Sequence, residues 1–187
     1  MEEPVTDQTP APPNPYDFLP QVPTFTLTSK DVADGETLAQ PFLSGLMGAG
    51  GEDRSPHLAW EGFPPETKSF AVTCFDPDAP TAAGFWHWAV CNIPAHVTEL
   101  PAGAGDPSGS GLPEGALTLP ASSGHVQYIG AAPPPQHREH RYMFVVHAVD
   151  VAKLELEPGT SPTILGFNLF FHTLARAYLT PVYENKG

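Results

Sequence analysis

Apolar and polar positions alternate over several short stretches of the chain, and clusters of turn-forming residues separate these stretches. The clearest pair, residues 70–75 and 87–93, flanks a loop that contains two aspartates, two prolines and a glycine. A third strong run covers residues 142–149, and weaker runs of the same kind occupy residues 24–27, 58–60 and 116–119. A period of two residues predicts β-strands at these places.

One helix is predicted near the C-terminus. Ser161 is a good N-cap residue, Pro162 suits the first helical position, and the pattern ends before Pro181. Its apolar positions are Ile164, Leu165, Phe167, Leu169, Phe170, Phe171, Leu174 and Tyr178. Many short strands, one late helix and no strand-helix alternation predict an all-β dominated fold: a β-sandwich of antiparallel or mixed sheets with a few peripheral helices.

Length and composition predict one domain preceded by an arm. A chain of 187 residues with 41% hydrophobic residues can bury a sizeable core. Residues 1–21 are rich in proline and acidic residues and lack periodicity, which predicts a flexible arm, with residues 16–19 as its docking end. We expect the arm to be a spacer, with partner binding as the alternative, and residues 22–187 to form the single domain.

The charge restricts the partners. With 8 Lys and Arg against 21 Asp and Glu, the formal net charge is −13, so phosphate backbones and anionic membranes repel the chain, and nucleic acid is not an expected partner. No secretory signal core and no long apolar span are evident, which predicts no membrane insertion and a cytoplasmic location. Alternation places Cys74 and Cys91 on one face of their strands, where we expect buried free thiols.

Four polar residues are predicted to meet at one rim of the sheet. Alternation puts Asp76 on the face of Cys74, at the end of the first apolar stripe, and His87 begins the stripe of the next strand. His140 and Tyr142 are two residues apart and share a face where the third strong strand begins. If the first two strands pair antiparallel, Asp76 and His87 lie at the same rim.

These side chains suit the binding of an anion. Two imidazole N–H groups and a phenol O–H can bind the oxygens of a phosphate or carboxylate, and Asp76 can accept from one imidazole and hold it cationic. The predicted pocket rim consists of Asp78, Pro80, Phe85, Trp86, Gly130, Pro133 and Pro134. In this interpretation Asp78 caps the turn after Asp76, and the apolar rim residues accept an aliphatic or aromatic group beside the anion.

Other interpretations share the same residues. Asp76, His87 and His140 are enough ligands for a catalytic zinc ion, or they can form a purely structural network of buried hydrogen bonds. The sequence HREH, residues 137–140, lacks the helical context of a metalloprotease motif. No serine or cysteine nucleophile with an oxyanion donor pair is evident, so we expect a binding protein without a cofactor; a weak hydrolase is the alternative.

Several spaced motifs carry a family resemblance. In order they are DPDAP (76–80), a histidine after an aromatic-rich turn (87), GAAPP (130–134) and HRY (140–142). Together they resemble the phosphatidylethanolamine-binding protein family, and with SPHLAWEGFP (55–64) its bacterial Raf-kinase-inhibitor-like branch. The likeness runs from about residue 24 to residue 183.

The resemblance implies a pocket for phosphorylated head groups, a role as regulator or inhibitor of a partner protein, and a homodimer. Its alternative is inhibition of a kinase or serine protease through surface loops, with the pocket vestigial. The chain departs from the family's G-x-G-P-P pattern at Ala132, where alanine stands for the second glycine. The change narrows the backbone freedom beside the pocket.

Overall fold

A five-stranded antiparallel sheet forms the centre of the structure, a computed structural model that describes residues 9–187. Its strands, in spatial order, are β6 (Leu117–Thr118), β4 (Phe85–Pro94), β3 (Ser69–Asp76), β8 (Met143–Val149) and β9 (Thr173–Leu179). A second sheet contains β1 (Thr26–Thr28), β2 (Leu58–Glu61) and β5 (Glu99–Leu100), and β7 (His140–Arg141) pairs with β10 (Val182–Tyr183). The helical elements are the 3-10 turns η1 (Pro15–Phe18) and η2 (Gln40–Phe42) and the helix α1 (Pro162–His172).

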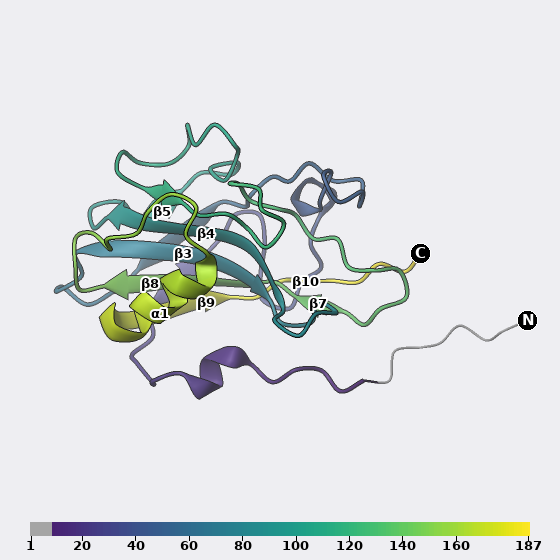
Figure 1. Cartoon of the computed structure of the whole chain (residues 1–187), viewed down its shortest axis with the longest axis horizontal. Helices are drawn as coiled ribbons and strands as arrows, with labels where there is room; N and C mark the ends of the chain where they lie inside the picture. The colour runs from purple at the N-terminus through teal and green to yellow at the C-terminus, as the bar shows by residue number, and fades with distance from the viewer. Residues whose placement is uncertain (1–8) are drawn as a thin grey trace, which may run out of the picture.

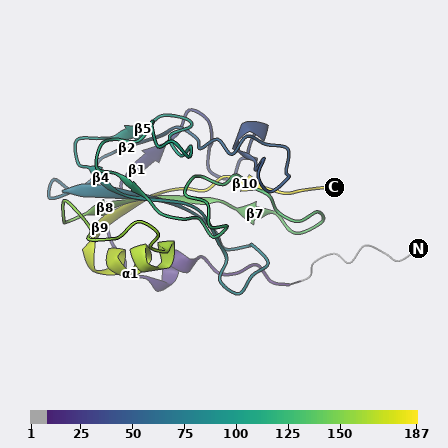
Figure 2. The same cartoon turned by 45° about the horizontal axis from the view of Figure 1, so that its top comes forward.

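The five-stranded sheet is covered on both faces. Figure 2 shows the smaller sheet on one side of it and α1 on the other. Phe70, Trp88 and Phe144 belong to the larger core cluster, on the side of the smaller sheet, whereas Ala71 and Leu165 belong to a second cluster beneath α1. The predicted β-sandwich with a peripheral C-terminal helix is confirmed. Among residues 9–187, no helix has the length and apolar character needed to cross a bilayer.

Strand β4 contains an extra residue near its N-terminal end. Cys74 pairs with Trp88 but the next residue, Phe75, pairs with Trp86, so His87 is left over as a β-bulge. The bulge shifts the register by one. Phe85 faces the same way as Asp76 before the bulge, and Trp88 and Val90 do so after it.

This shift separates the two cysteines. Cys74 lies in the core cluster beside the smaller sheet and Cys91 in the cluster beneath α1, so the prediction of a common face is wrong. Both thiols are free and buried. Burial raises the pKa of Cys91 to about 11 and that of Cys74 well above its usual value, so both remain protonated.

The C-terminal helix is shorter than predicted. Its start is as expected, with the Ser161 hydroxyl accepting from the backbone N–H of Ile164, but it ends at His172. The following residues form β9, so Leu174 and Tyr178 lie on a strand and not on the helix. Pairing with β8 decides this, because β9 supplies the hydrogen bonds that the edge of β8 would otherwise lack. The apolar run alone did not distinguish the two outcomes.

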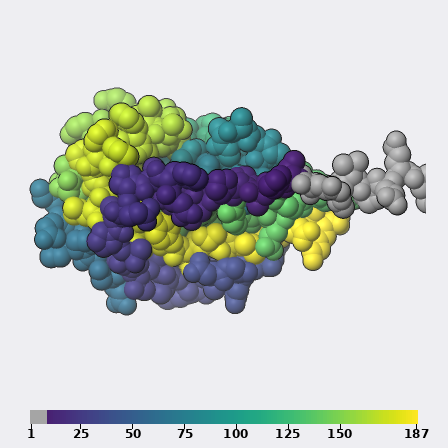
Figure 3. Space-filling model, turned by 90° about the horizontal axis from the view of Figure 1, so that it is seen from below, coloured from purple at the N-terminus to yellow at the C-terminus, as the bar shows by residue number. Residues whose placement is uncertain are grey.

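The N-terminal segment lies along the body. Residues 1–8 of the predicted arm are outside the described residues. In the remainder, Tyr16 on η1 is only 8% exposed and packs with Val145 against the sheet face that carries α1. The Arg141 guanidinium also donates to the carbonyl of Pro12, at 2.7 Å. Figure 3 shows this purple segment lying beside the yellow-green surface of α1.

Candidate functional site

A cavity of about 230 Å³ lies at the edge of the central sheet, where β3 ends and β7 begins. Figure 1 shows β7 and the loop between β3 and β4 at the same end of the sheet. The lining residues are Met47, Asp76, Ala79, Pro80, Thr81, Phe85, His87, Ala132, Pro133, Pro134, His140 and Tyr142. The four residues predicted to bind an anion are therefore brought together here.

Asp76 is a buried residue of this cavity, and both of its carboxylate oxygens contact protein groups. Its carboxylate is 2% exposed, and Oδ1 accepts from the backbone N–H groups of Asp78 at 2.8 Å and Ala79 at 3.1 Å. Oδ2 lies 2.7 Å from His140 Nδ1 and 3.9 Å from His87 Nε2. Burial by itself raises the pKa of Asp76, but the hydrogen bonds and charges of the two histidines outweigh it and hold that pKa below its usual value.

The bulge in β4 turns His87 toward the cavity. Its Nδ1 lies 2.7 Å from the backbone carbonyl oxygen of Ile129. Because a carbonyl only accepts, Nδ1 carries the proton in the neutral ring, and Nε2 carries one only when the ring is the imidazolium cation. His87 can thus donate to an anion in the cavity only as a cation, and it then also lies near the charge of Asp76.

His140 is already engaged at both ring nitrogens. Nδ1 donates to Asp76, and Nε2 lies 2.6 Å from Nδ1 of His137. His140 was predicted to offer an N–H group to a ligand; in this structure it instead connects the buried carboxylate to a second imidazole. The contact with His137 was missed, although the spacing of three residues in HREH was its sequence signal.

Tyr142 supplies a hydroxyl without a partner. The side chain is 1% exposed, and its oxygen makes no hydrogen bond within residues 9–187. Its ring lies 5.1 Å from that of His87, centroid to centroid. Burial, assisted by the charge of Asp76, raises the pKa of Tyr142 far above its usual value, so the hydroxyl keeps its proton and can donate.

Four of the predicted rim residues line the cavity, namely Pro80, Phe85, Pro133 and Pro134. Asp78 does not. Its carboxylate instead forms a bidentate pair with Arg141, Oδ2 to Nε at 2.8 Å and Oδ1 to Nη2 at 3.1 Å. The turn cap assigned to Asp78 belongs to Asp76, because the Asp76 carboxylate is the one that points back along the chain to the N–H groups of the turn.

Trp86 and Gly130 are also absent from the lining. Trp86 pairs with Phe75, and both line a different cavity, on the face of the sheet that carries α1. Gly130 packs behind the pocket: a Cβ added there would lie 2.2 Å from the backbone carbon of Leu43, and its N–H donates to Asp53 Oδ1 at 2.8 Å. Gly130 is therefore a residue of close backbone approach.

Part of the lining was not predicted. Met47 comes from the glycine-rich stretch 45–51, in which Gly48 and Gly50 have positive φ values of 80° and 74°. This stretch offers no periodic pattern, and Met47 is its only long side chain apart from Leu46. The flexible thioether can adapt to the shape of a bound group.

Within the part of the chain that the structure describes, no group of three or more His, Cys, Asp and Glu side chains is arranged to hold a metal ion. His140 has both ring nitrogens hydrogen-bonded, and Asp76 uses both oxygens. Two of the three residues considered as zinc ligands are therefore already engaged by protein groups.

Similarity to known proteins shows the family of this chain. The model of the phosphatidylethanolamine-binding protein family matches residues 28–184. The chain belongs to this family. It is 46% identical to the protein YbhB of Escherichia coli (strain K12) over 161 residues, which cover 84% of this chain and 99% of YbhB. The predicted likeness to this family is confirmed.

Solved structures of other proteins share the fold. The crystal structure of Escherichia coli YbcL superimposes with a TM-score of 0.84 at 42% identity and covers 86% of this chain and 98% of YbcL. A carboxypeptidase Y inhibitor, solved in complex with its proteinase, has a TM-score of 0.52 at 20% identity and covers 88% of this chain and 85% of the inhibitor. The second likeness is one of fold alone.

Proposed function

We propose that this protein binds small phosphorylated molecules in the cavity between β3, β4 and β7. The anion would accept hydrogen bonds from the Tyr142 hydroxyl and from Nε2 of cationic His87. Asp76 would stabilise the imidazolium from 3.9 Å without touching the ligand. With a net charge of −13, the chain repels anions at long range, so such short-range donors are needed.

The unpartnered hydroxyl of Tyr142 is the observation that carries the proposal. Buried polar groups are nearly always hydrogen-bonded, and leaving one without a partner costs about 1 to 3 kcal/mol. The Tyr142 oxygen is buried and without a partner in the described residues, yet the side chain lines a cavity. A ligand oxygen would satisfy it.

The rest of the lining favours a ligand with an apolar part. Phe85, Pro80, Pro133 and Pro134 present apolar surface beside the two donors. The class of ligand is therefore a phosphomonoester or a similar anion with a small aliphatic or aromatic group.

We propose binding and not turnover. The lining residues include no serine, cysteine or lysine, and the hydroxyl of Thr81 is engaged with the carbonyl of Gly84 at 2.7 Å. The same proposal includes a cytoplasmic location, a homodimer and a regulatory effect on a protein partner. Inhibition of a kinase or serine protease rests on the family resemblance alone and stays a prediction.

Calorimetry with phenyl phosphate tests the proposal. We expect saturable binding to the native chain, loss of about tenfold or more in affinity for His87→Ala, and no change for His125→Ala, an exposed histidine that does not line the cavity. Equal affinity for the native chain and His87→Ala would contradict the assignment. Release of inorganic phosphate that stops in His140→Ala would show an enzyme instead.

A further inference from the structure

A second cavity, also of about 230 Å³, lies on the face of the central sheet that carries α1. Strand residues Thr73, Trp86 and Arg176 contribute to its floor. Its walls come from two separate segments, the N-terminal turn η1 with Tyr16 and the helix α1 with Gly166. This cavity therefore lies between the N-terminal segment and α1, and the proposed function does not use it.

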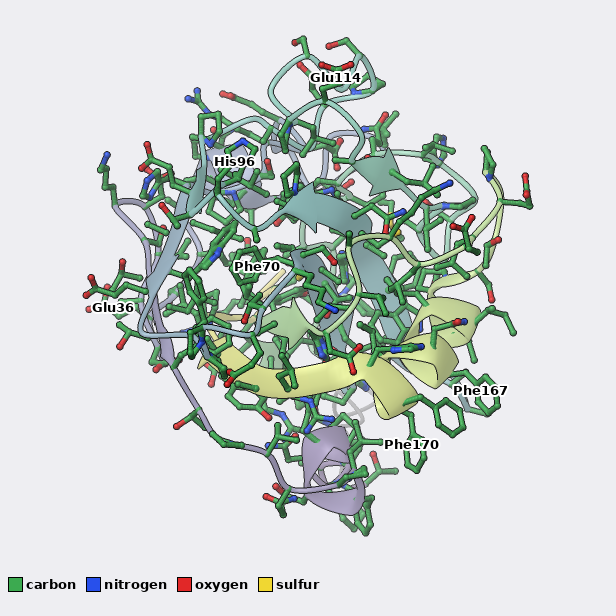
Figure 4. The ribbon with its side chains drawn as sticks, turned by 90° about the vertical axis from the view of Figure 1, so that its left-hand side faces the viewer. Glu36, Phe70, His96, Glu114, Phe167 and Phe170 are labelled. Carbon is green, nitrogen blue, oxygen red and sulfur yellow. The ribbon has the colours of Figure 1, made fainter. Side chains whose placement is uncertain are left out.

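The lining of this second cavity is mostly apolar. Leu19, Phe75, Leu169 and Phe170 supply aliphatic and aromatic surface. Figure 4 shows Phe170 and Phe167 projecting outward from α1. An engineered apolar cavity of about 150 Å³ binds benzene, so the second cavity can hold a molecule on the order of ten non-hydrogen atoms.

One buried cation lies in this apolar surrounding. Arg176 is 3% exposed, and among its guanidinium nitrogens Nη1 donates to the carbonyl of Pro20 at 3.0 Å. Nε is buried and makes no hydrogen bond within residues 9–187, and no carboxylate there pairs with the group.

The surroundings do not neutralise this charge. His147, the residue opposite Arg176 on β8, has its pKa lowered to about 3 by burial and by the guanidinium, so its ring is neutral. The Tyr16 ring lies 5.8 Å from the guanidinium carbon, and burial raises the pKa of its hydroxyl to about 12. A buried charge without a counter-charge is costly, and an anionic guest would relieve that cost.

Another arginine of the same chain shows what such a group binds. Arg141 uses Nε and Nη2, one edge of its guanidinium, to bind both oxygens of the Asp78 carboxylate. Arg176 uses Nη1 for the Pro20 carbonyl and leaves the corresponding edge unpaired. The planar fork of a guanidinium matches a carboxylate in two parallel hydrogen bonds.

We infer that the second cavity binds a small amphipathic carboxylate. Its carboxylate lies on the Nε and Nη2 edge of Arg176, and its aliphatic or aryl part fills the space between η1 and α1. The N-terminal segment then serves as one wall of a binding site. A carboxylate is favoured over a phosphate because the site offers one cation in an apolar surrounding.

Octanoate is the probe for this site, with 1-octanol as its neutral counterpart, and calorimetry is the readout. We expect saturable octanoate binding that exceeds octanol binding about tenfold or more, and a similar loss in Arg176→Gln. Gly166→Leu should block the cavity while preserving the fold, because a Cβ at this helical position meets nothing within 4 Å. Asn168→Leu, which adds the same side chain outside the lining, is the matched control and should bind normally.

The remaining outcomes separate the alternatives. Octanoate binding that persists in His87→Ala and disappears in Gly166→Leu supports the second cavity. Binding lost in His87→Ala and kept in Gly166→Leu would place octanoate in the first cavity and overturn the inference. No saturable octanoate binding overturns it, and so does octanol binding as strong as octanoate binding. If Gly166→Leu alters self-association and octanoate does not bind, a second copy of the chain is the occupant and the inference is wrong.

Discussion

Nδ1 of His87 lies 2.7 Å from the carbonyl oxygen of Ile129, which fixes a proton on the nitrogen that faces away from the cavity. Nε2 therefore accepts a hydrogen bond when the ring is neutral and donates one only when the ring is cationic. One backbone carbonyl thus makes anion binding by His87 depend on the protonation of its ring.

The first prediction concerns pH. Sulfate affinity should fall as the pH is raised across the neutral range, because only the cationic form of His87 donates from Nε2. Sulfate keeps a constant charge across this range, so the protein alone is titrated. Calorimetry at several pH values measures the effect. A profile that stays flat would mean that neutral donors hold the anion.

The second prediction concerns the hydroxyl of Tyr142. Tyr142→Phe should weaken phosphate binding by about tenfold, because one donor to the ligand is lost, and the fold should be retained because the hydroxyl has no protein partner in the described residues. Tyr128→Phe is the matched control, since that buried hydroxyl donates to the carbonyl of Phe42 at 3.2 Å. The control should lose stability and keep affinity; the reverse pattern would refute the role of Tyr142.

The third prediction concerns acid stability. The pKa of Asp76 is lowered in the folded state, so this carboxylate contributes stability at pH values above its unfolded pKa, and that contribution is lost as pH falls through the folded pKa. Asp76→Asn should reduce the free energy of unfolding at neutral pH by about 1 to 3 kcal/mol and flatten its fall below about pH 4.

Urea unfolding at several pH values measures both effects of the Asp76 substitution. Asp17→Asn, at an exposed position on η1, should leave the free energy of unfolding nearly unchanged. If the free energy of unfolding varied with pH in the same way for the native chain and for Asp76→Asn, the carboxylate would not stabilise the fold.

The fourth prediction concerns the glycine behind the pocket. Gly130→Ala should destabilise the chain by about 3 kcal/mol or more and disturb the cavity, because the new Cβ would overlap the backbone of Leu43. Gly166→Ala, a helical position with open space, should stabilise the chain by about 0.5 to 1 kcal/mol. Thermal unfolding of the two variants measures the contrast. Equal melting temperatures would show that the close approach at Gly130 is easily relaxed.

Much of the site followed from the sequence because its residues lie next to strong strands. The apolar runs predicted β3, β4 and β8, and Asp76, His87 and Tyr142 stand at or beside their ends. Strand ends at one edge of an antiparallel sheet meet in space, so the four predicted residues came together.

The details could not be predicted because they depend on distant partners. Alternation alone cannot reveal the extra residue at His87, which reverses the facing of β4 and separates Cys91 from Cys74. The acceptor that fixes the ring of His87 is the carbonyl of Ile129, 42 residues away. The pairing of Asp78 with Arg141 likewise spans 63 residues.

The end of α1 also could not be predicted from the sequence. An apolar run from Pro162 to Leu179 suits a helix or a strand, and the switch after His172 is decided by the unpaired edge of β8. The second cavity also could not be predicted from sequence patterns, because its lining comes from the N-terminal segment, α1 and four strands.

A crystal structure of the native chain grown with phenyl phosphate tests the central claim most directly. The account predicts the phosphoryl group in the cavity, with oxygens within about 3.2 Å of His87 Nε2 and the Tyr142 hydroxyl and the phenyl ring against Phe85. A map at saturating ligand with this cavity filled only by water, and the ester bound elsewhere or absent, would contradict it.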